Sequence, residues 1–321
     1  MLKKVEGKDM TGKTKKNISL VNLMNISSVK YCDISEMFLL AKRAELLSMR
    51  SIQLYEYQLN LFEKFLRQKN ISLVSEITMN VLQSYISELA QTHKPRTCHI
   101  SFRVLRTFTY WFENYTNSDY VSPMHKMRAP KLPKDKKSSC NLDDFSRLLS
   151  GCDGCNEKRD KALLMLAYDS GLRKGEIIAL NIENIDAVTG RIEVICGKGD
   201  KYRTAFISQP TLRAIREYLK ERGNLNDYDP LFTSTRDIRF TEQGLTSLLK
   251  RVQKRARIDI HGFHSLRRGF AREFIVNGGG MFQLQQLMGH EDISTTQNYV
   301  GLDEKDIEQA HRKASPMNRL K

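Results

Sequence analysis

His264-Ser265-Leu266-Arg267-Arg268 and Leu287-Met288-Gly289-His290 are the two runs around which this 321-residue chain is organised, and Tyr299 follows nine residues after His290. They bring together arginines, histidines and one tyrosine. A guanidinium presents a planar fork of donors that matches the oxygens of a phosphate, and it can stabilise the charge that builds up during phosphate transfer. A tyrosine oxygen can become covalently joined to phosphorus. These residue types are therefore suited to attack on a phosphodiester.

A second arginine-containing run lies upstream, in Gly171-Leu172-Arg173-Lys174-Gly175-Glu176. The glycine before Arg173 predicts a turn that leads into a new helix. On a helix, residues three apart are neighbours, so Glu176 is expected to lie beside Arg173 and could orient it.

Between these runs, the pattern of a β-hairpin carries two lysines. Residues 191–195 and 204–207 are strand-like, and the glycine-rich turn between them contains Lys198 and Lys201. Further helical patterns lie at 142–149, 158–169, 211–221 and 241–257, and the glycines at 278–280 are expected to end the helix that carries Arg267. The predicted class is mainly α with a small β-sheet.

Taken in chain order, these motifs resemble those of the tyrosine recombinase family, also called the phage integrases, which includes the Xer recombinases. A single His-x-x-Arg occurs by chance, whereas the whole set in this order does not, and scattered surface cations around a buried tyrosine are a poor alternative. Arg268 departs from the pattern, because family members often carry a second histidine there. The motifs are Arg173 with Glu176, Lys198, His264 with Arg267, Gly289 with His290, and Tyr299.

The resemblance implies that Tyr299 is the nucleophile. It would attack the scissile phosphate, join the 3′ phosphate and release a 5′ hydroxyl, while Lys198 protonates the departing 5′ oxygen. Lys201 shares the hairpin turn, so either lysine could reach a phosphate, although Lys198 between two glycines stands at the family's position.

The resemblance also implies how the phosphate is held. Arg173 and Arg267 would clamp the non-bridging oxygens, and His264 and His290 would add hydrogen bonds or assist proton transfer. Glu176 would support the site without reacting. A free tyrosine has a pKa of about 10, so the surrounding cations must stabilise the phenolate. Exchange of a phosphodiester for a phosphotyrosine of similar energy requires no ATP, and arginines take the place of a metal, so no cofactor is expected.

The composition indicates a polyanionic partner. A formal net charge of +15, from 52 Lys and Arg against 37 Asp and Glu, favours double-stranded DNA, because each neutralised phosphate releases counterions. No apolar run approaches the roughly 18 residues of a membrane span, and a cytoplasmic, nucleoid-associated protein is expected. Cys152 and Cys155 form a C-x-x-C, but no second pair follows at zinc-site spacing.

Four segments are expected along the chain. Residues 1–32 form a basic, flexible extension, and residues 33–118 form a helical domain that resembles the family's SAM-like core-binding domain. Residues 119–138 form a basic, proline-containing linker, and residues 139–321 form an α+β catalytic domain.

The helical stripes support the second of these segments. Tyr55, Leu59, Phe62 and Leu66 lie on one face of a helix that is expected to open near Ser51. After Pro95, a basic stripe accompanies an apolar face, and in so basic a chain it is a candidate for DNA contact as well as an ordinary solvated surface. The stripe consists of Arg96, His99, Arg103 and Arg106.

The resemblance implies a homotetramer on paired recombination sites, with DNA-bending or directionality proteins as accessory partners. It also implies that the helix expected at 303–313 docks on the neighbouring protomer, and the alternative is a helix that packs on its own chain. The host reaction stays open between integration or excision of a mobile element and resolution of a chromosome or plasmid. Two alternatives remain. One is an enzyme similar to type IB topoisomerases, which nicks and closes one duplex, and the other is a non-catalytic DNA-binding regulator.

Overall fold

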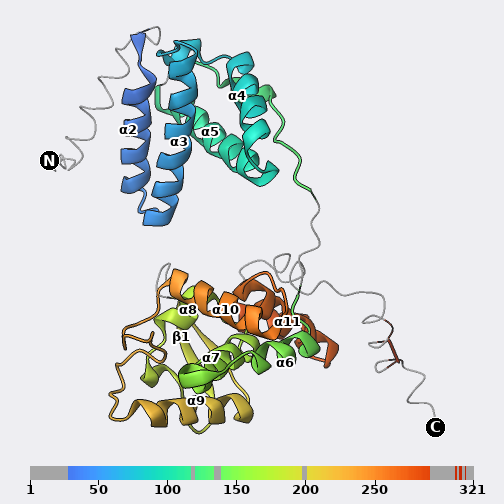
Figure 1. Cartoon of the computed structure of the whole chain (residues 1–321). Helices are drawn as coiled ribbons and strands as arrows, with labels where there is room; N and C mark the ends of the chain where they lie inside the picture. The colour runs from blue at the N-terminus through green and yellow to red at the C-terminus, as the bar shows by residue number, and fades with distance from the viewer. Residues whose placement is uncertain are drawn as a thin grey trace, which may run out of the picture. The chain divides into compact units, whose positions relative to one another are not determined.

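The structure is a computed structural model that describes residues 28–116, 120–133, 139–196 and 201–289, together with residues 308, 311, 312 and 315. The chain divides into two compact units, Met1–Asp135 and Lys136–Lys321. Helices dominate both units, and the strands of the described residues form a single two-stranded sheet (Figure 1). The predicted class, mainly α with a small β-sheet, is confirmed.

In the first unit, the described residues form four α-helices whose apolar faces share one core. They are α2 (Tyr31–Ala44), α3 (Met49–Gln68), α4 (Met79–Thr92) and α5 (Pro95–Thr116). The helix expected near Ser51 begins two residues earlier, because the Ser48 hydroxyl accepts the Ser51 amide and caps it. Leu59, Phe62 and Leu66 of the predicted stripe are each only 1% exposed.

Part of the stretch expected to act as a linker packs onto this first unit. Pro123–Lys126 form a short 3-10 helix after Ser122, and Met124 and Met127 are buried in the core of the unit. The proline-rich composition correctly excludes a long helix, but it does not reveal that two methionines anchor the segment.

Helix α7 lies at the centre of the second unit, and other elements of the unit pack around it. It contains α6 (Leu142–Ser150), α7 (Glu157–Asp169), α8 (Lys174–Ala179), β1 (Arg191–Cys196), β2 (Lys201–Phe206), α9 (Gln209–Arg222), α10 (Glu242–Ala256), α11 (Phe263–Val276) and α12 (Met281–Met288). Leu163, Leu164 and Leu166 lie on different faces of α7, and none is exposed to solvent. Helices α9 and α11 both pack against α7, while α10 packs against α6 and α8 (Figure 1).

The predicted hairpin is present, but β2 begins at Lys201, which was expected to lie in the turn, and ends at Phe206. Strands β1 and β2 are antiparallel, with Arg191 opposite Phe206 and Val194 opposite Arg203. Helix α11 ends at Val276, just before the three glycines, as expected. The short helix α12 follows at Met281, and the sequence did not indicate it.

A glycine in α11 permits a close crossing in this unit. A Cβ on Gly269 would lie 2.1 Å from the Cys140 carbonyl oxygen and 2.6 Å from the Tyr168 ring. The backbone cannot separate easily there, because the Cys140 amide donates to the Ser265 carbonyl at 3.1 Å. The Tyr168 ring is also stacked on the Phe145 ring, with 4.0 Å between the ring centroids.

We therefore expect Gly269→Ala to lower the free energy of unfolding by about 1–3 kcal/mol, the usual cost of overpacking a core. Gly175→Ala is the matched control, because it also lies inside a helix but no atom lies within 4 Å of its added Cβ. That change is expected to stabilise by about 0.5–1 kcal/mol. Thermal denaturation followed by circular dichroism measures both, and equal shifts would contradict the crossing.

None of the helices in the described part of the chain is long and apolar enough to cross a membrane.

Candidate active site

The entry to α8 brings Arg173 and Glu176 together. Arg173 precedes the first turn in an extended conformation, with φ −71° and ψ 150°. Glu176 reaches back, so that its Oε2 accepts the Arg173 amide at 2.7 Å and its Oε1 accepts Arg173 Nη1 at 2.9 Å. The two side chains are adjacent, as their spacing predicts, although the reason is a helix cap rather than two neighbouring helical positions. The Arg173 side chain remains 41% exposed.

Arg267 reaches the same carboxylate from α11. Its Nη1 lies 3.9 Å from Glu176 Oε2 and donates to the Gly171 carbonyl at 2.5 Å, while Nη2 donates to the Met288 carbonyl at 2.7 Å. With its side chain only 1% exposed, Arg267 is among the largest fully buried residues. Burial of a charge is costly unless hydrogen bonds and an opposite charge compensate it. These contacts supply both.

A third arginine, which sequence reasoning did not single out, completes the group. Arg203 on β2 donates from Nη2 to Glu176 Oε2 at 2.5 Å and from Nη1 to the Leu287 carbonyl at 2.6 Å. Its alternation with Ala205 and Ile207, which are buried, is the signal that could have found it. An arginine in register with buried apolar residues of a strand points inward and needs an acidic partner.

The three arginines also hold the end of α12. Helix termini leave their last carbonyls without intrahelical partners. Here the carbonyls of Leu287, Met288 and Gly289 accept one guanidinium each, and Arg173 Nη2 provides the bond to Gly289 at 3.2 Å. His290, the next residue in the sequence, thus follows directly on this group.

The charges of the group do not cancel. Three guanidinium groups against the single Glu176 carboxylate leave a net charge of +2. Because Arg203 and Glu176 are largely withdrawn from water, this charge is screened less than it would be at an open surface. The arrangement favours an anion beside the exposed face of Arg173.

His264 lies in the first turn of α11, close to these cations. Partial loss of hydration lowers its pKa below the usual value of 6.5, and the positive charges of Arg267, Arg268, Lys174 and Arg173 lower it further. The imidazole is therefore neutral near pH 7, and it can accept a hydrogen bond or a proton.

We expect Arg268→Gln to raise the pKa of His264 towards its usual value, because one of the charges that oppose protonation is removed. Titration of the ring 13Cε1 resonance by NMR measures the change, with Arg213→Gln, an exposed position on α9, as the control. The folded state holds the imidazole neutral, whereas the unfolded chain protonates below pH 6.5. Stability from this group is therefore present above pH 6.5 and is lost as the pH falls. An unchanged or lowered pKa in Arg268→Gln would contradict this electrostatic account.

Several predicted residues fall outside the described part of the chain. They are Lys198, His290 and Tyr299, and the side chain of Lys201. Of the helix expected at 303–313, the structure describes residues 308, 311 and 312, which are helical, and Arg312 pairs with Glu308 at 2.6 Å. Their assigned roles remain predictions.

The basic stripe on α5 does not face solvent uniformly. Arg96 and Arg103 are exposed, but His99 Nδ1 lies 3.0 Å from the Pro130 carbonyl oxygen. Arg106 donates to the Met127 carbonyl at 3.0 Å and lies over the Phe102 ring. Two of the four residues of the stripe thus contact the segment that follows the helix.

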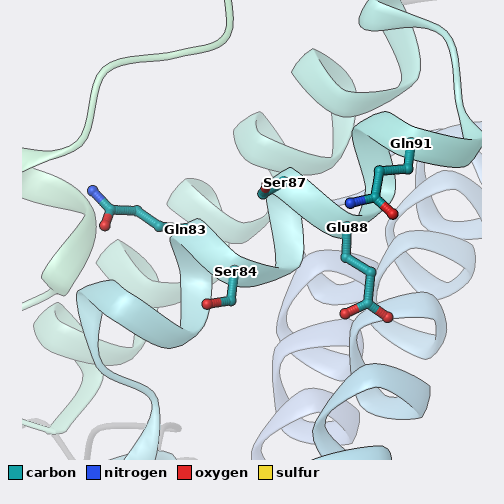
Figure 2. Close-up of a pocket in the computed structure, with 5 residues that line it drawn as sticks. All are labelled: Gln83, Ser84, Ser87, Glu88 and Gln91. Atoms are coloured by element: carbon teal, nitrogen blue, oxygen red, sulfur yellow. The ribbon is translucent and has the colours of Figure 1, made fainter.

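Helix α4 presents a different surface in the same unit. A shallow hollow on its exposed face is lined by Gln83, Ser84, Ser87, Glu88 and Gln91, whose side chains point away from the helix (Figure 2). These side chains include no cation, and Glu88 pairs with Lys69 at 3.6 Å. This hollow is therefore poorly suited to a phosphate.

The predicted C-x-x-C does not bring its thiols into one setting. Cys152 is buried in the core of the second unit and Cys155 is exposed. Within the described residues, no three His, Cys, Asp or Glu side chains are grouped so that they could hold a metal ion.

Comparison with known proteins identifies the family. Residues 140–306 match the model of the phage integrase family. Tyrosine recombinase XerC of Alcanivorax borkumensis is 31% identical over 249 residues, which cover 75% of this chain and 80% of that protein. Tyrosine recombinase XerD of Listeria monocytogenes is 28% identical over 291 residues, which cover 87% and 96%.

The fold agrees with this identification. A lambda integrase tetramer bound to a Holliday junction matches with a TM-score of 0.70 and 15% identity, over 90% of this chain and 83% of that one. The two arginine runs, the hairpin and α12 all lie within the stretch matched by the family model. The chain belongs to the phage integrase family, the tyrosine recombinases.

Proposed function

We propose that the protein is a site-specific DNA recombinase that cuts and rejoins strands through a 3′-phosphotyrosine on Tyr299. The observation that carries this proposal is the group of three arginines around Glu176, in which the Arg173 side chain is 41% exposed. A phosphodiester gains negative charge as it passes to the transition state, so a fixed excess of positive charge stabilises that state more than the ground state.

The first step follows from this group. The Tyr299 oxygen attacks phosphorus, its bond to the 3′ phosphate forms and the bond to the 5′ oxygen breaks. Lys198 gives a proton to the departing 5′ oxygen, and Arg173 and Arg267 hold the non-bridging oxygens. In the reverse sense, a 5′ hydroxyl from a partner strand attacks the phosphotyrosine and reseals the backbone. The phenolic proton that Tyr299 loses on attack passes to His264, which is neutral near pH 7, or to His290, and both can also donate hydrogen bonds.

Arg173 and Arg267 are not equivalent in this scheme. The Arg173 side chain is partly exposed and already oriented by Glu176, so it is the first to meet the phosphate. Arg267 spans the carbonyls of Gly171 and Met288, and each of its terminal nitrogens carries a second N–H. Arg267 can therefore hold these two carbonyls and donate to a phosphate at the same time. The positive charge that a metal provides in other phosphoryl-transfer sites comes here from side chains, and this scheme needs no ATP or cofactor.

The first unit would serve as the core-binding domain, with double-stranded DNA as its partner. Arg96 and Arg103, seven residues apart on α5, lie on one face of the helix and are exposed.

A lambda integrase of the same fold forms a tetramer on a Holliday junction, and four copies are proposed here on paired sites. Acting on chromosomal DNA, the protein would associate with the nucleoid. The host reaction is integration or excision of a mobile element, or resolution of a chromosome or plasmid, with accessory proteins setting its direction.

The role of α5 leads to a prediction about salt. Arg96→Ala combined with Arg103→Ala is expected to weaken binding and to reduce the slope of log K against log salt by about one to two, one for each lost phosphate contact. Fluorescence anisotropy with a duplex selected from a random-sequence pool by the wild-type protein measures this. Arg213→Ala is the control. An unchanged slope in the double variant would remove α5 from the DNA interface.

Plasmid assays separate this proposal from its alternatives. A recombinase exchanges strands between two copies of the selected duplex on one supercoiled plasmid and leaves a plasmid without the site supercoiled. Relaxation of the plasmid without the site would favour the topoisomerase-like enzyme. Binding without any cut strand would favour the non-catalytic regulator.

A further inference from the structure

Arg203 connects three elements that are distant in the sequence. It lies on β2, its Nη2 bonds to Glu176 on α8, and its Nη1 bonds to the Leu287 carbonyl in the last turn of α12. These partners are 27 and 84 residues away along the chain. The side chain is only 9% exposed, so the guanidinium faces these partners and not the solvent.

The strand register explains this orientation. Arg203 pairs with Val194, and it shares its face of β2 with Ala205, which is fully buried. A cation on the inner face of a hairpin must be compensated. Glu176 provides the charge, and its geometry depends on Arg203 in turn, because Oε2 accepts from both Arg203 and the Arg173 amide while Oε1 accepts from Arg173 Nη1.

The Arg203 side chain also passes close to the backbone of Gly289, which supports its inward orientation. A Cβ on Gly289 would lie 2.5 Å from Arg203 Cδ and 2.8 Å from Arg203 Nε. Gly289 also has φ +61°, in the left-handed region that favours glycine. The stem of Arg203 therefore passes directly across the backbone that leads into His290, and a glycine leaves room for it.

We propose that Arg203 is a positioning residue for strand cleavage. It fixes the Glu176 carboxylate, and through it the Arg173 guanidinium, and it ties β2 to the end of α12. This inference rests on the proposed function, because it concerns the step in which Arg173 meets the scissile phosphate. Arg203 does not touch the phosphate itself. Without it, Glu176 loses one of the three arginines around it, and Arg173 loses a defined orientation.

The test compares variants at position 203 in the full-length protein. The substrate is the selected duplex, nicked at each central position in turn so that the released 5′ fragment diffuses away and the covalent adduct accumulates. Arg203→Met keeps an unbranched apolar stem but removes the guanidinium, and with it the charge and both bonds. Arg203→Lys keeps the charge, but one amine cannot bond to Glu176 and Leu287 in the way that the forked guanidinium does. Arg191→Met is the matched control, because Arg191 is an exposed arginine on the other strand of the hairpin, paired only with Glu193 among the contacts described.

At saturating protein, Arg203→Met is expected to form adduct about 10²-fold more slowly than the wild type, the loss typical of a misplaced catalytic group. Arg203→Lys is expected to fall between the two, and Arg191→Met to match the wild type. The Kd for the intact duplex should change less than about twofold in all three, because Arg203 faces inward. A purely structural defect would lower the amplitude of adduct formation and leave its rate constant unchanged.

A double-mutant cycle tests the route through Glu176. Because Arg203 acts through that carboxylate, adding Arg203→Met to Glu176→Gln is expected to cost less than about threefold in rate. Full multiplication of the two effects, or a wild-type rate in Arg203→Met, would overturn the proposal. If Arg203→Met does not fold, a wild-type rate in Arg203→Lys has the same force. Failure of the wild-type protein to form any adduct would overturn the proposed function instead, so the two failures are distinguishable.

Discussion

Arg173→Ala is expected to slow adduct formation on the nicked selected duplex by about 10²-fold or more, with little change in the Kd for the intact duplex. The Arg173 side chain is 41% exposed, and its Nη1 donates to Glu176 Oε1 at 2.9 Å, which orients the guanidinium. It therefore presents donors to charge that develops only in the transition state. Loss of such a donor lowers the rate constant and leaves ground-state binding nearly unchanged. Single-turnover kinetics on denaturing gels measure the rate, with Arg213→Ala as the control.

Arg267→Ala should show a second effect that Arg173→Ala lacks. Both variants lose cleavage, but Arg267 is buried and holds the carbonyls of Gly171 and Met288. Removal of one partner from a buried charged group costs about 3–5 kcal/mol. Arg267→Ala should therefore lower the Tm clearly more than Arg173→Ala does. Equal Tm values, or a large loss of DNA binding in Arg173→Ala, would contradict the division between an exposed phosphate ligand and a buried scaffold.

Features set by local periodicity could be predicted from the sequence. The stripe that contains Leu59, Phe62 and Leu66 depends only on spacing along one helix, so α3 was placed to within two residues. The hairpin follows from two strand-like runs around a glycine-rich turn. The contact between Arg173 and Glu176 spans three residues, and it survives although the local geometry is a cap rather than a helical pair.

Features set by distant contacts could not be predicted in this way. Arg203 meets the Leu287 carbonyl across 84 residues, and Arg173 meets the Gly289 carbonyl across 116. A backbone carbonyl has no signature in the sequence, so the hydrogen bonds from three arginines to the last carbonyls of α12 could not be predicted. Helix α12 itself is too short to show a clear helical periodicity of apolar residues.

The basic stripe on α5 is a second case in which distant contacts could not be predicted from the sequence. A count of charges treats every arginine as open to solvent. His99 and Arg106 instead contact the carbonyls of Pro130 and Met127, which lie in the stretch expected to be a tether. Of the four residues of the stripe, Arg96 and Arg103 are exposed, while His99 and Arg106 are partly buried.

Covalent trapping with Tyr299→Phe tests the central claim most directly. The wild-type protein, incubated with the nicked selected duplex, is expected to form a covalent protein–DNA adduct that survives denaturation, with the phosphate mapped by mass spectrometry to the peptide that contains Tyr299. Phenylalanine keeps the ring but has no oxygen to join to phosphorus, so Tyr299→Phe is expected to form none while still binding the duplex. Tyr228→Phe, an exposed tyrosine of the same unit, is the control and should react like the wild type. An adduct that persists in Tyr299→Phe, or one that maps to another residue in the wild type, would contradict the account.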